Sequence, residues 1–185
     1  GAGMSITLGD FDAVPGLEFR ITALLIGNEI VFDIAASEPG PGFAMMRWPK
    51  PVDTGAVAIN GYAVIPRMQG MLLPDDWPQA INAEDLCNSR SLYMPWWGQV
   101  RGLGEGVQAI LETSADAGGE YHHPKGGGTR INPCWYPTLG SFGYLRTIRY
   151  VFSDNATHVT MAKRCRQHVI DRGDFVPLRQ KLVRT

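Results

Sequence analysis

The chain has 185 residues, of which 44% are hydrophobic and 19% charged, and its formal net charge is −1. This length and composition are typical of one globular domain, and the absence of a basic block excludes the electrostatic pattern of a nucleic-acid-binding protein. No apolar run reaches the roughly 18–20 residues that a membrane-spanning helix needs. We therefore expect neither nucleic acid nor a membrane as a partner.

The first half of the chain reads as strands separated by tight turns. Residues 1–5 resemble the remnant of an expression tag, and a strand begins at Ile6. The runs 17–26 and 29–35 are joined by Gly27-Asn28, which predicts an antiparallel hairpin. A short strand is expected within 43–48, a second hairpin within 55–66 that turns at Asn60-Gly61, and an apolar run over 68–73.

The second half adds strands and one helix. Residues 74–87 read as a polar loop with one helical turn, and the Gly-rich segment 116–128 reads as a loop. Strands are expected near 90–97, 106–113 and 142–153. Val159, Ala162, Cys165 and Val169 recur at helical spacing, which predicts a helix capped by Asp154 or Asn155 and ended by Gly173. Lys163, Arg164 and Arg166 mark its solvated face, and 178–183 is a second short helix.

Turn signals at intervals of roughly 8–12 residues are the pattern of an all-β sandwich. The fold class that we predict is mainly β: an antiparallel β-sandwich with a C-terminal α-helix. The sandwich domain spans 6–153, and 154–185 form the helix and a linker.

Two aromatic pairs stand beside prolines and glycines in extended runs. They are Trp96-Trp97 and Trp135-Tyr136. A flat aromatic ring suits the apolar C–H face of a pyranose, so these four rings are candidates for carbohydrate binding. Neighbouring residues of a strand point to opposite faces, so we expect one ring of each pair to be buried and the other exposed. The alternative is that the rings only fill the core.

Charged and polar candidates give weaker signals. Arg146 and Arg149 should face opposite sides of one strand; one should pair with Asp116 or Glu112, and Arg146 is a candidate for binding sugar hydroxyls. Glycoside hydrolysis needs two carboxylates, but the spacing singles out no catalytic pair among Asp75, Asp76, Glu84, Asp85, Glu112, Asp116 and Glu120. Neither the three separated cysteines nor His122-His123 predicts a metal site, and we expect no cofactor.

Five segments carry a resemblance to a known family. They are Met94-Pro95-Trp96-Trp97-Gly98; 109–113 followed by Asp116-Ala117; 137–146 with 149–152; 161–166; and 69–74. Over roughly residues 60–185 the sequence resembles the galactose-mutarotase-like β-supersandwich domain that precedes a TIM barrel in a group of large bacterial glycoside hydrolases. The chain departs from this pattern at Cys165, where the family favours an aromatic residue, and contains fewer strands than a complete supersandwich.

The resemblance implies that the catalytic carboxylates belong to a barrel outside this chain. We therefore expect a non-catalytic, carbohydrate-associated domain, either binding or scaffold, of a bacterial glycoside hydrolase. Its expected partners are a polysaccharide or oligosaccharide and the catalytic barrel of the parent chain, and a polysaccharide-degrading parent is expected to be secreted or periplasmic. Two alternatives stay open: an enzyme with its own carboxylate pair, and a domain that only braces the barrel, marked by an exposed apolar patch.

Overall fold

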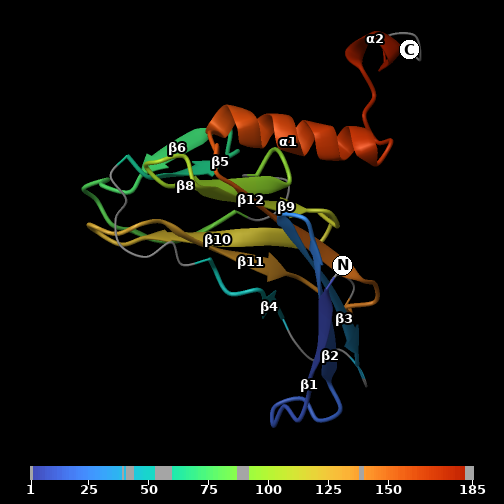
Figure 1. Ribbon diagram of the computed structural model, residues 1–185. Coiled ribbons are helices and arrows are strands. Elements are labelled where there is room, and N and C mark those ends of the chain that lie inside the picture. The colour runs from blue at the N-terminus through green and yellow to red at the C-terminus, as the bar shows by residue number, and fades with distance from the viewer. Residues whose placement is uncertain are drawn as a thin grey trace.

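The computed structural model describes residues 2–38, 40, 44–52, 60–86, 92–137 and 140–181. Three layers are stacked: helix α1 lies on one face of a large antiparallel sheet, and a smaller sheet covers part of the other face (Figure 1). This arrangement confirms the predicted β-sandwich with a C-terminal helix.

The large sheet has eight strands in the order β1-β2-β3-β12-β9-β8-β5-β6. Its strands are β1 (Gly3–Leu8), β2 (Glu18–Ile26), β3 (Glu29–Ser37), β5 (Tyr62–Ile65), β6 (Met71–Pro74), β8 (Trp96–Val100), β9 (Gly106–Leu111) and β12 (Arg146–Ser153). The small sheet has the order β4-β11-β10-β7, with β4 (Met46–Arg47), β7 (Ile81–Asp85), β10 (Ala117–His123) and β11 (Arg130–Trp135). The helices are α1 (His158–Asp171) and α2 (Leu178–Lys181).

The β2–β3 hairpin forms where the sequence predicts it. Gly27 adopts φ 60°, a left-handed conformation that glycine tolerates, and Ile26 pairs with Glu29 across the turn. The register continues to Glu18 and Ser37. The predicted second hairpin begins among residues outside the described part, and β5 pairs instead with β6 and β8.

The main core lies between the two sheets. Apolar side chains on the inner face of the large sheet, such as Phe19, Ile21 and Ile148, meet Tyr121 and Trp135 of the small sheet. A second, smaller cluster lies between the outer face of the large sheet and α1, and it includes Trp96, Met161 and Cys165. Both faces of the central strands are therefore covered.

Two segments predicted as loops are strands. Residues 117–123 form β10 and 81–85 form β7, which pair with each other. Gly119 of β10 packs closely against its surroundings. A Cβ at this position would lie 3.4 Å from the Trp97 ring and 3.3 Å from the Asn132 carbonyl oxygen. This glycine lets the small sheet approach the large one, which is a packing role that a turn interpretation overlooks.

Helix α1 begins at a different cap from the predicted one. Thr157 is the N-cap and exchanges bonds with Thr160 in a capping box, while Gly173, at φ 76°, follows the end as predicted. Met161, Cys165 and His168 form the buried face, whereas Val159 is exposed. The short helix α2 also falls within its predicted range. No helix in the described part of the chain is long and apolar enough to span a membrane.

Candidate functional site

Both indoles of the first aromatic pair are buried. Trp96 is 2% exposed and packs beneath α1, whereas Trp97 is 3% exposed and lies in the main core. They do point to opposite faces of β8, as alternation requires, but a layer covers each face. The expectation of one exposed ring is therefore wrong for this pair.

The second pair is also largely enclosed. Trp135 is fully buried, and its Nε1–H donates to the Trp48 carbonyl oxygen at 2.7 Å. Tyr136 is half-buried next to it. Three of the four predicted rings thus fill the interior, where a saccharide in solution has no access, and only Tyr136 reaches the surface in part.

Arg146 is a buried cation at the start of β12. Its side chain has no solvent exposure, and Nη2 lies 3.3 Å from Oδ2 of Asp116. The guanidinium lies between two rings, 4.4 Å from the centroid of Phe142 and 3.2 Å from that of Tyr144. Burial lowers the pKa of Arg146, although Tyr144 and Asp116 oppose that shift. The predicted pairing with Asp116 is confirmed, and this geometry leaves no face of the guanidinium for a ligand.

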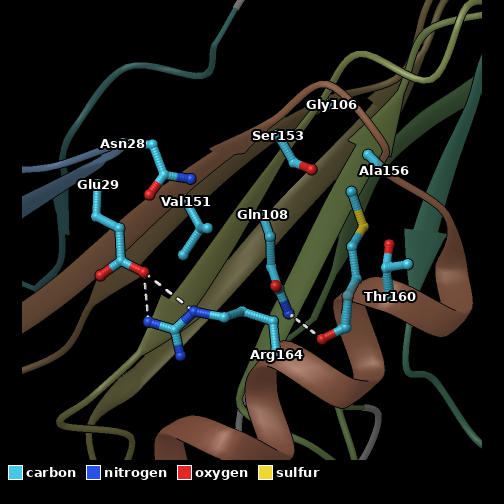
Figure 2. Close-up of a pocket in the computed structure, with 10 residues that line it drawn as sticks. Asn28, Glu29, Gly106, Gln108, Val151, Ser153, Ala156, Thr160 and Arg164 are labelled. Carbon is cyan, nitrogen blue, oxygen red and sulfur yellow. Dashed lines mark hydrogen bonds and ion pairs between the residues drawn. The ribbon is translucent and has the colours of Figure 1, made fainter.

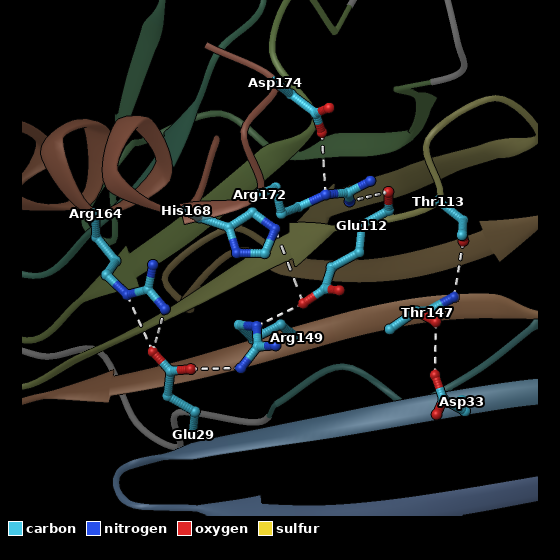
Figure 3. A network of polar contacts seen from close by, with 10 residues as sticks. All are labelled: Glu29, Asp33, Glu112, Thr113, Thr147, Arg149, Arg164, His168, Arg172 and Asp174. Carbon is cyan, nitrogen blue, oxygen red and sulfur yellow. Dashed lines mark hydrogen bonds and ion pairs between the residues drawn. The ribbon is translucent and has the colours of Figure 1, made fainter. Parts of the chain in front are cut away.

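A polar network joins α1 to the outer face of the large sheet (Figure 3). At its centre, Arg149 of β12 donates from Nε to Glu112 at 2.5 Å and from Nη1 to Glu29 at 2.6 Å. Arg164 of α1 also pairs with Glu29. Glu29 therefore bridges a strand arginine and a helix arginine, so the helix is fastened to the sheet by charge. Arg149 facing the side opposite to Arg146, and pairing with Glu112, confirms the sequence prediction.

Two further residues close this network, which we call the α1 clamp: Glu29, Glu112, Arg149, Arg164, His168 and Arg172. His168 Nε2 lies 3.9 Å from Glu112 Oε1, and Arg172 donates to the Glu112 carbonyl oxygen at 2.9 Å. Burial lowers the pKa of His168, and the neighbouring arginines lower it further against the opposing effect of Glu112. His168 is thus uncharged at neutral pH, and only arginines supply positive charge to the clamp.

The surroundings of Glu29 in the clamp are those of a salt-bridged carboxylate rather than of a general acid. Burial alone would raise the pKa of Glu29, but hydrogen bonds and charges from Arg164 and Arg149 outweigh it and hold that pKa below its usual value. A general acid in glycoside hydrolysis needs the opposite shift. Other candidates are also paired: Asp116 with Arg146 and Glu120 with Arg47. The side chains of Glu84 and Asp85 lie outside the described residues.

A hollow of about 320 Å³ lies beside the clamp, between the N-terminal end of α1 and the β2–β3 turn (Figure 2). Its polar lining is already engaged within the protein. Gln108 donates to the Met161 carbonyl oxygen at 2.8 Å, and Asn28 donates to that of Phe152. The first bond connects β9 to α1 and the second connects the β2–β3 turn to β12. The lining of the hollow therefore adds to the contacts of the clamp.

An exposed apolar surface lies at the other end of the large sheet. Met4, Ile6 and Leu25 are 61%, 36% and 48% exposed, and their register places them on the same face as the buried Phe19 and Ile21. The surface continues into an apolar pocket of about 330 Å³, which Leu8 lines together with Phe11, Val14, Leu17, Met46 and Trp48. The small sheet ends at β4. Among the described residues, the part of this face that carries Met4, Ile6 and Leu25 therefore has no covering layer, although Phe19 and Ile21 on the same face are buried.

The histidine pair lies on β10 rather than in a loop. His123 is fully buried, with Nδ1 3.1 Å from Thr129 Oγ1 and Nε2 3.1 Å from the Trp77 carbonyl oxygen. Within the described ranges, no three histidine, cysteine, aspartate or glutamate side chains converge as metal ligands would.

Sequence reasoning missed most of the clamp. Arg164 was expected on a solvated helix face, and neither Glu29 nor His168 was assigned a role. One signal was available: Glu29 precedes the apolar run 30–32 and Arg149 lies between Ile148 and Tyr150. Charged residues in such positions are rarely buried without a partner.

No protein-family model matches the chain, and no curated protein matches it either. Solved structures do. The chain is similar to α-N-acetylgalactosaminidase NagBb from Bifidobacterium bifidum in complex with GalNAc, at 26% identity and a TM-score of 0.89 over 100% of this chain and 31% of that one. A quadruple mutant gives 24% identity and a TM-score of 0.88, and the ligand-free form 23% and 0.81; each match covers 99% of this chain and 32% of the other. The chain thus spans about a third of the glycoside hydrolase that it matches.

Proposed function

We propose that this chain is a non-catalytic structural domain of a larger glycoside hydrolase and that its apolar surface on β1 and β2 packs against the remainder of that enzyme. The observation that carries the proposal is the distribution of apolar side chains. The predicted sugar-binding indoles are enclosed, whereas Met4, Ile6 and Leu25 extend the core face into solvent. Exposed apolar surface continuous with a core marks an interface.

The relative lengths of this chain and the similar hydrolase support the proposal that the remainder of the enzyme covers the apolar surface. The similar hydrolase is about three times as long as this chain, since the match covers 31% of it. The resemblance to the galactose-mutarotase-like domain implies a catalytic barrel in the parent, and that barrel would be the partner that covers the apolar surface. The apolar pocket beside Leu8 and Trp48 would receive a side chain from that neighbour.

The α1 clamp contributes to this role by fixing the helix. Salt bridges from Arg149 and Arg164 converge on Glu29, so α1 cannot slide along the sheet without breaking them. The domain would therefore present its helix and its apolar surface to the parent in one fixed arrangement. The neighbour named as an α-N-acetylgalactosaminidase makes α-linked N-acetylgalactosamine the first substrate to try for the parent.

The test compares one substitution in two contexts. Leu25→Gln removes an apolar side chain that is 48% exposed, so in the isolated chain it should change stability by less than about 0.5 kcal/mol. In the full-length polypeptide the same side chain would be buried, and the substitution should destabilise it by about 1–2 kcal/mol. Leu103→Gln, in the β8–β9 turn at 93% exposure, is the matched control and should be neutral in both.

Two results would overturn the proposal. One is equal thermal stability of the full-length wild type and the Leu25→Gln variant, measured by calorimetry, because it would leave the surface unoccupied. The other is release of nitrophenol from nitrophenyl glycosides, the α-N-acetylgalactosaminide included, by the isolated chain. That second result would establish the enzyme alternative.

A further inference from the structure

The surface around Tyr144 holds one aromatic ring in a fixed, exposed position. Tyr144 is 44% exposed although three contacts restrain it. Its hydroxyl donates to Asp116 Oδ2 at 2.5 Å, its backbone N–H donates to the Phe142 carbonyl oxygen at 2.5 Å, and the Arg146 guanidinium lies 3.2 Å from its ring centroid. Burial and the bond to Asp116 both raise the pKa of this hydroxyl.

These contacts determine which part of the ring is accessible. The Arg146 guanidinium lies over the ring of Tyr144 and also over the ring of Phe142, which is 1% exposed. One face of the Tyr144 ring is therefore covered and its hydroxyl edge is occupied. The exposed area belongs to the opposite face and the free edge, beside the exposed Ser141, Gly143 and Leu145.

We infer that the outer face of Tyr144 is a stacking platform for a saccharide ring. A flat, apolar face matches the C–H face of a pyranose, and the exposed Ser141 beside it offers a hydroxyl to the rim of the sugar. Because the ring cannot turn without breaking its bond to Asp116, stacking costs little side-chain entropy. The rings predicted to do this are buried, and Tyr144 takes that role at the surface.

The charge behind the ring selects the class of ligand. Arg146 already occupies one face of the π-system, and a second cation on the outer face would be repelled by it. Lysine-rich or arginine-rich peptides are therefore poor occupants, and a neutral saccharide is favoured. One ring engages about one sugar residue, so binding should be weak and should gain from the repeated units of a polysaccharide.

The test is affinity gel electrophoresis of the 185-residue chain in gels that contain neutral polysaccharides, α-linked N-acetylgalactosaminides among them. The wild type should be retarded in at least one gel. Tyr144→Ala should weaken the apparent affinity about five- to tenfold, the range expected for loss of one aromatic stack. Tyr144→Phe should stay within about twofold because it keeps the ring face. Tyr93→Ala, at a tyrosine that is 65% exposed elsewhere, is the matched control and should behave like the wild type.

Tyr144→Leu is a second variant that tests the inference if Tyr144→Ala fails to fold. Leucine keeps an apolar contact above Arg146 but offers no flat face, so it should lose retardation while circular dichroism and melting temperature stay close to those of the wild type. Absence of wild-type retardation in every gel overturns the inference. So does equal retardation of the wild type and the folded Tyr144→Leu variant.

Discussion

Gly106 is the residue at which helix docking depends on the absence of a side chain. It starts β9 beneath the segment that leads into α1. A Cβ at this position would overlap the Cβ of Ala156 and would lie 2.8 Å from the Gln99 carbonyl oxygen. Both neighbours are part of, or bonded directly to, the backbone, so Gly106→Ala forces a shift of the chain.

The cost follows from two opposing effects. Overpacking of a close-packed interior destabilises by about 1–3 kcal/mol, while replacing glycine by alanine restricts the unfolded chain and returns about 0.4–1 kcal/mol. The net loss should be about 1–2 kcal/mol, which in a domain of this length lowers the melting temperature by about 3–8 °C. Gly98→Ala should cost less, because its Cβ would overlap the flexible end of Met161, while the nearest backbone atom, the Val107 carbonyl oxygen, would lie 3.2 Å away.

Thermal unfolding followed by circular dichroism measures the loss, and hydrogen exchange locates it. Amides of α1 should exchange faster in Gly106→Ala, while those of β10 keep their protection. Gly40→Ala is the control, since nothing lies within 4 Å of its added Cβ. A melting temperature of Gly106→Ala within 1 °C of the Gly40→Ala value, with α1 exchange unchanged, would refute the close approach.

Three further outcomes follow from the clamp and its surroundings. Arg149→Met leaves Glu29 and Glu112 without their shared cation and should lower the free energy of unfolding in urea by about 2–3 kcal/mol, less than for a fully buried pair because these side chains are 13–17% exposed; an unchanged urea midpoint would contradict this. Because the pKa of His168 is lowered in the folded state, its contribution to stability is complete above about pH 6.5 and declines as pH falls below that value, where the unfolded chain takes up the proton first. His168→Gln should therefore flatten stability between pH 7 and about pH 5, and an unaltered pH profile would argue against a neutral buried imidazole. Cys165 is buried, and burial raises its thiol pKa, so mass mapping should find it unmodified by maleimide until the protein unfolds; rapid labelling under native conditions would show that α1 opens.

The sequence predicts the β2–β3 hairpin and the helix because those signals are local. Gly27-Asn28 determines the β2–β3 turn whatever lies beside it, and Gly173 ends α1 through its own backbone conformation. Strands β7 and β10 were missed because their identity depends on partners distant in sequence. Gly118 and Gly119 discourage a strand locally, yet Gly119 lies against the Trp97 ring, where the two sheets approach each other.

The expected exposure of one ring of the Trp96-Trp97 pair was wrong for a related reason. The alternation of side chains in a strand correctly predicts that Trp96 and Trp97 point to opposite faces of the sheet. It does not indicate whether each face is covered, and here the helix α1, which is distant in sequence, covers Trp96. The sequence correctly predicts that one of Arg146 and Arg149 pairs with Asp116 or Glu112, because the expected strands bring such charged residues side by side. Tyr144 was not predicted as a binding residue because its exposure and its contacts with Arg146 and Asp116 depend on how the segment before β12 folds.

The two adjacent indoles of β8 are intrinsic fluorescence probes of two different layers of the protein. Trp96 faces the helix layer beside the sulfur atoms of Met161 and Cys165, while Trp97 faces the inter-sheet core. Because the chain has five tryptophans, the difference in emission between the wild type and a Trp96→Phe or Trp97→Phe variant isolates the signal from one layer. Emission spectra of the two variants would then show whether helix and sandwich melt as one unit or in sequence.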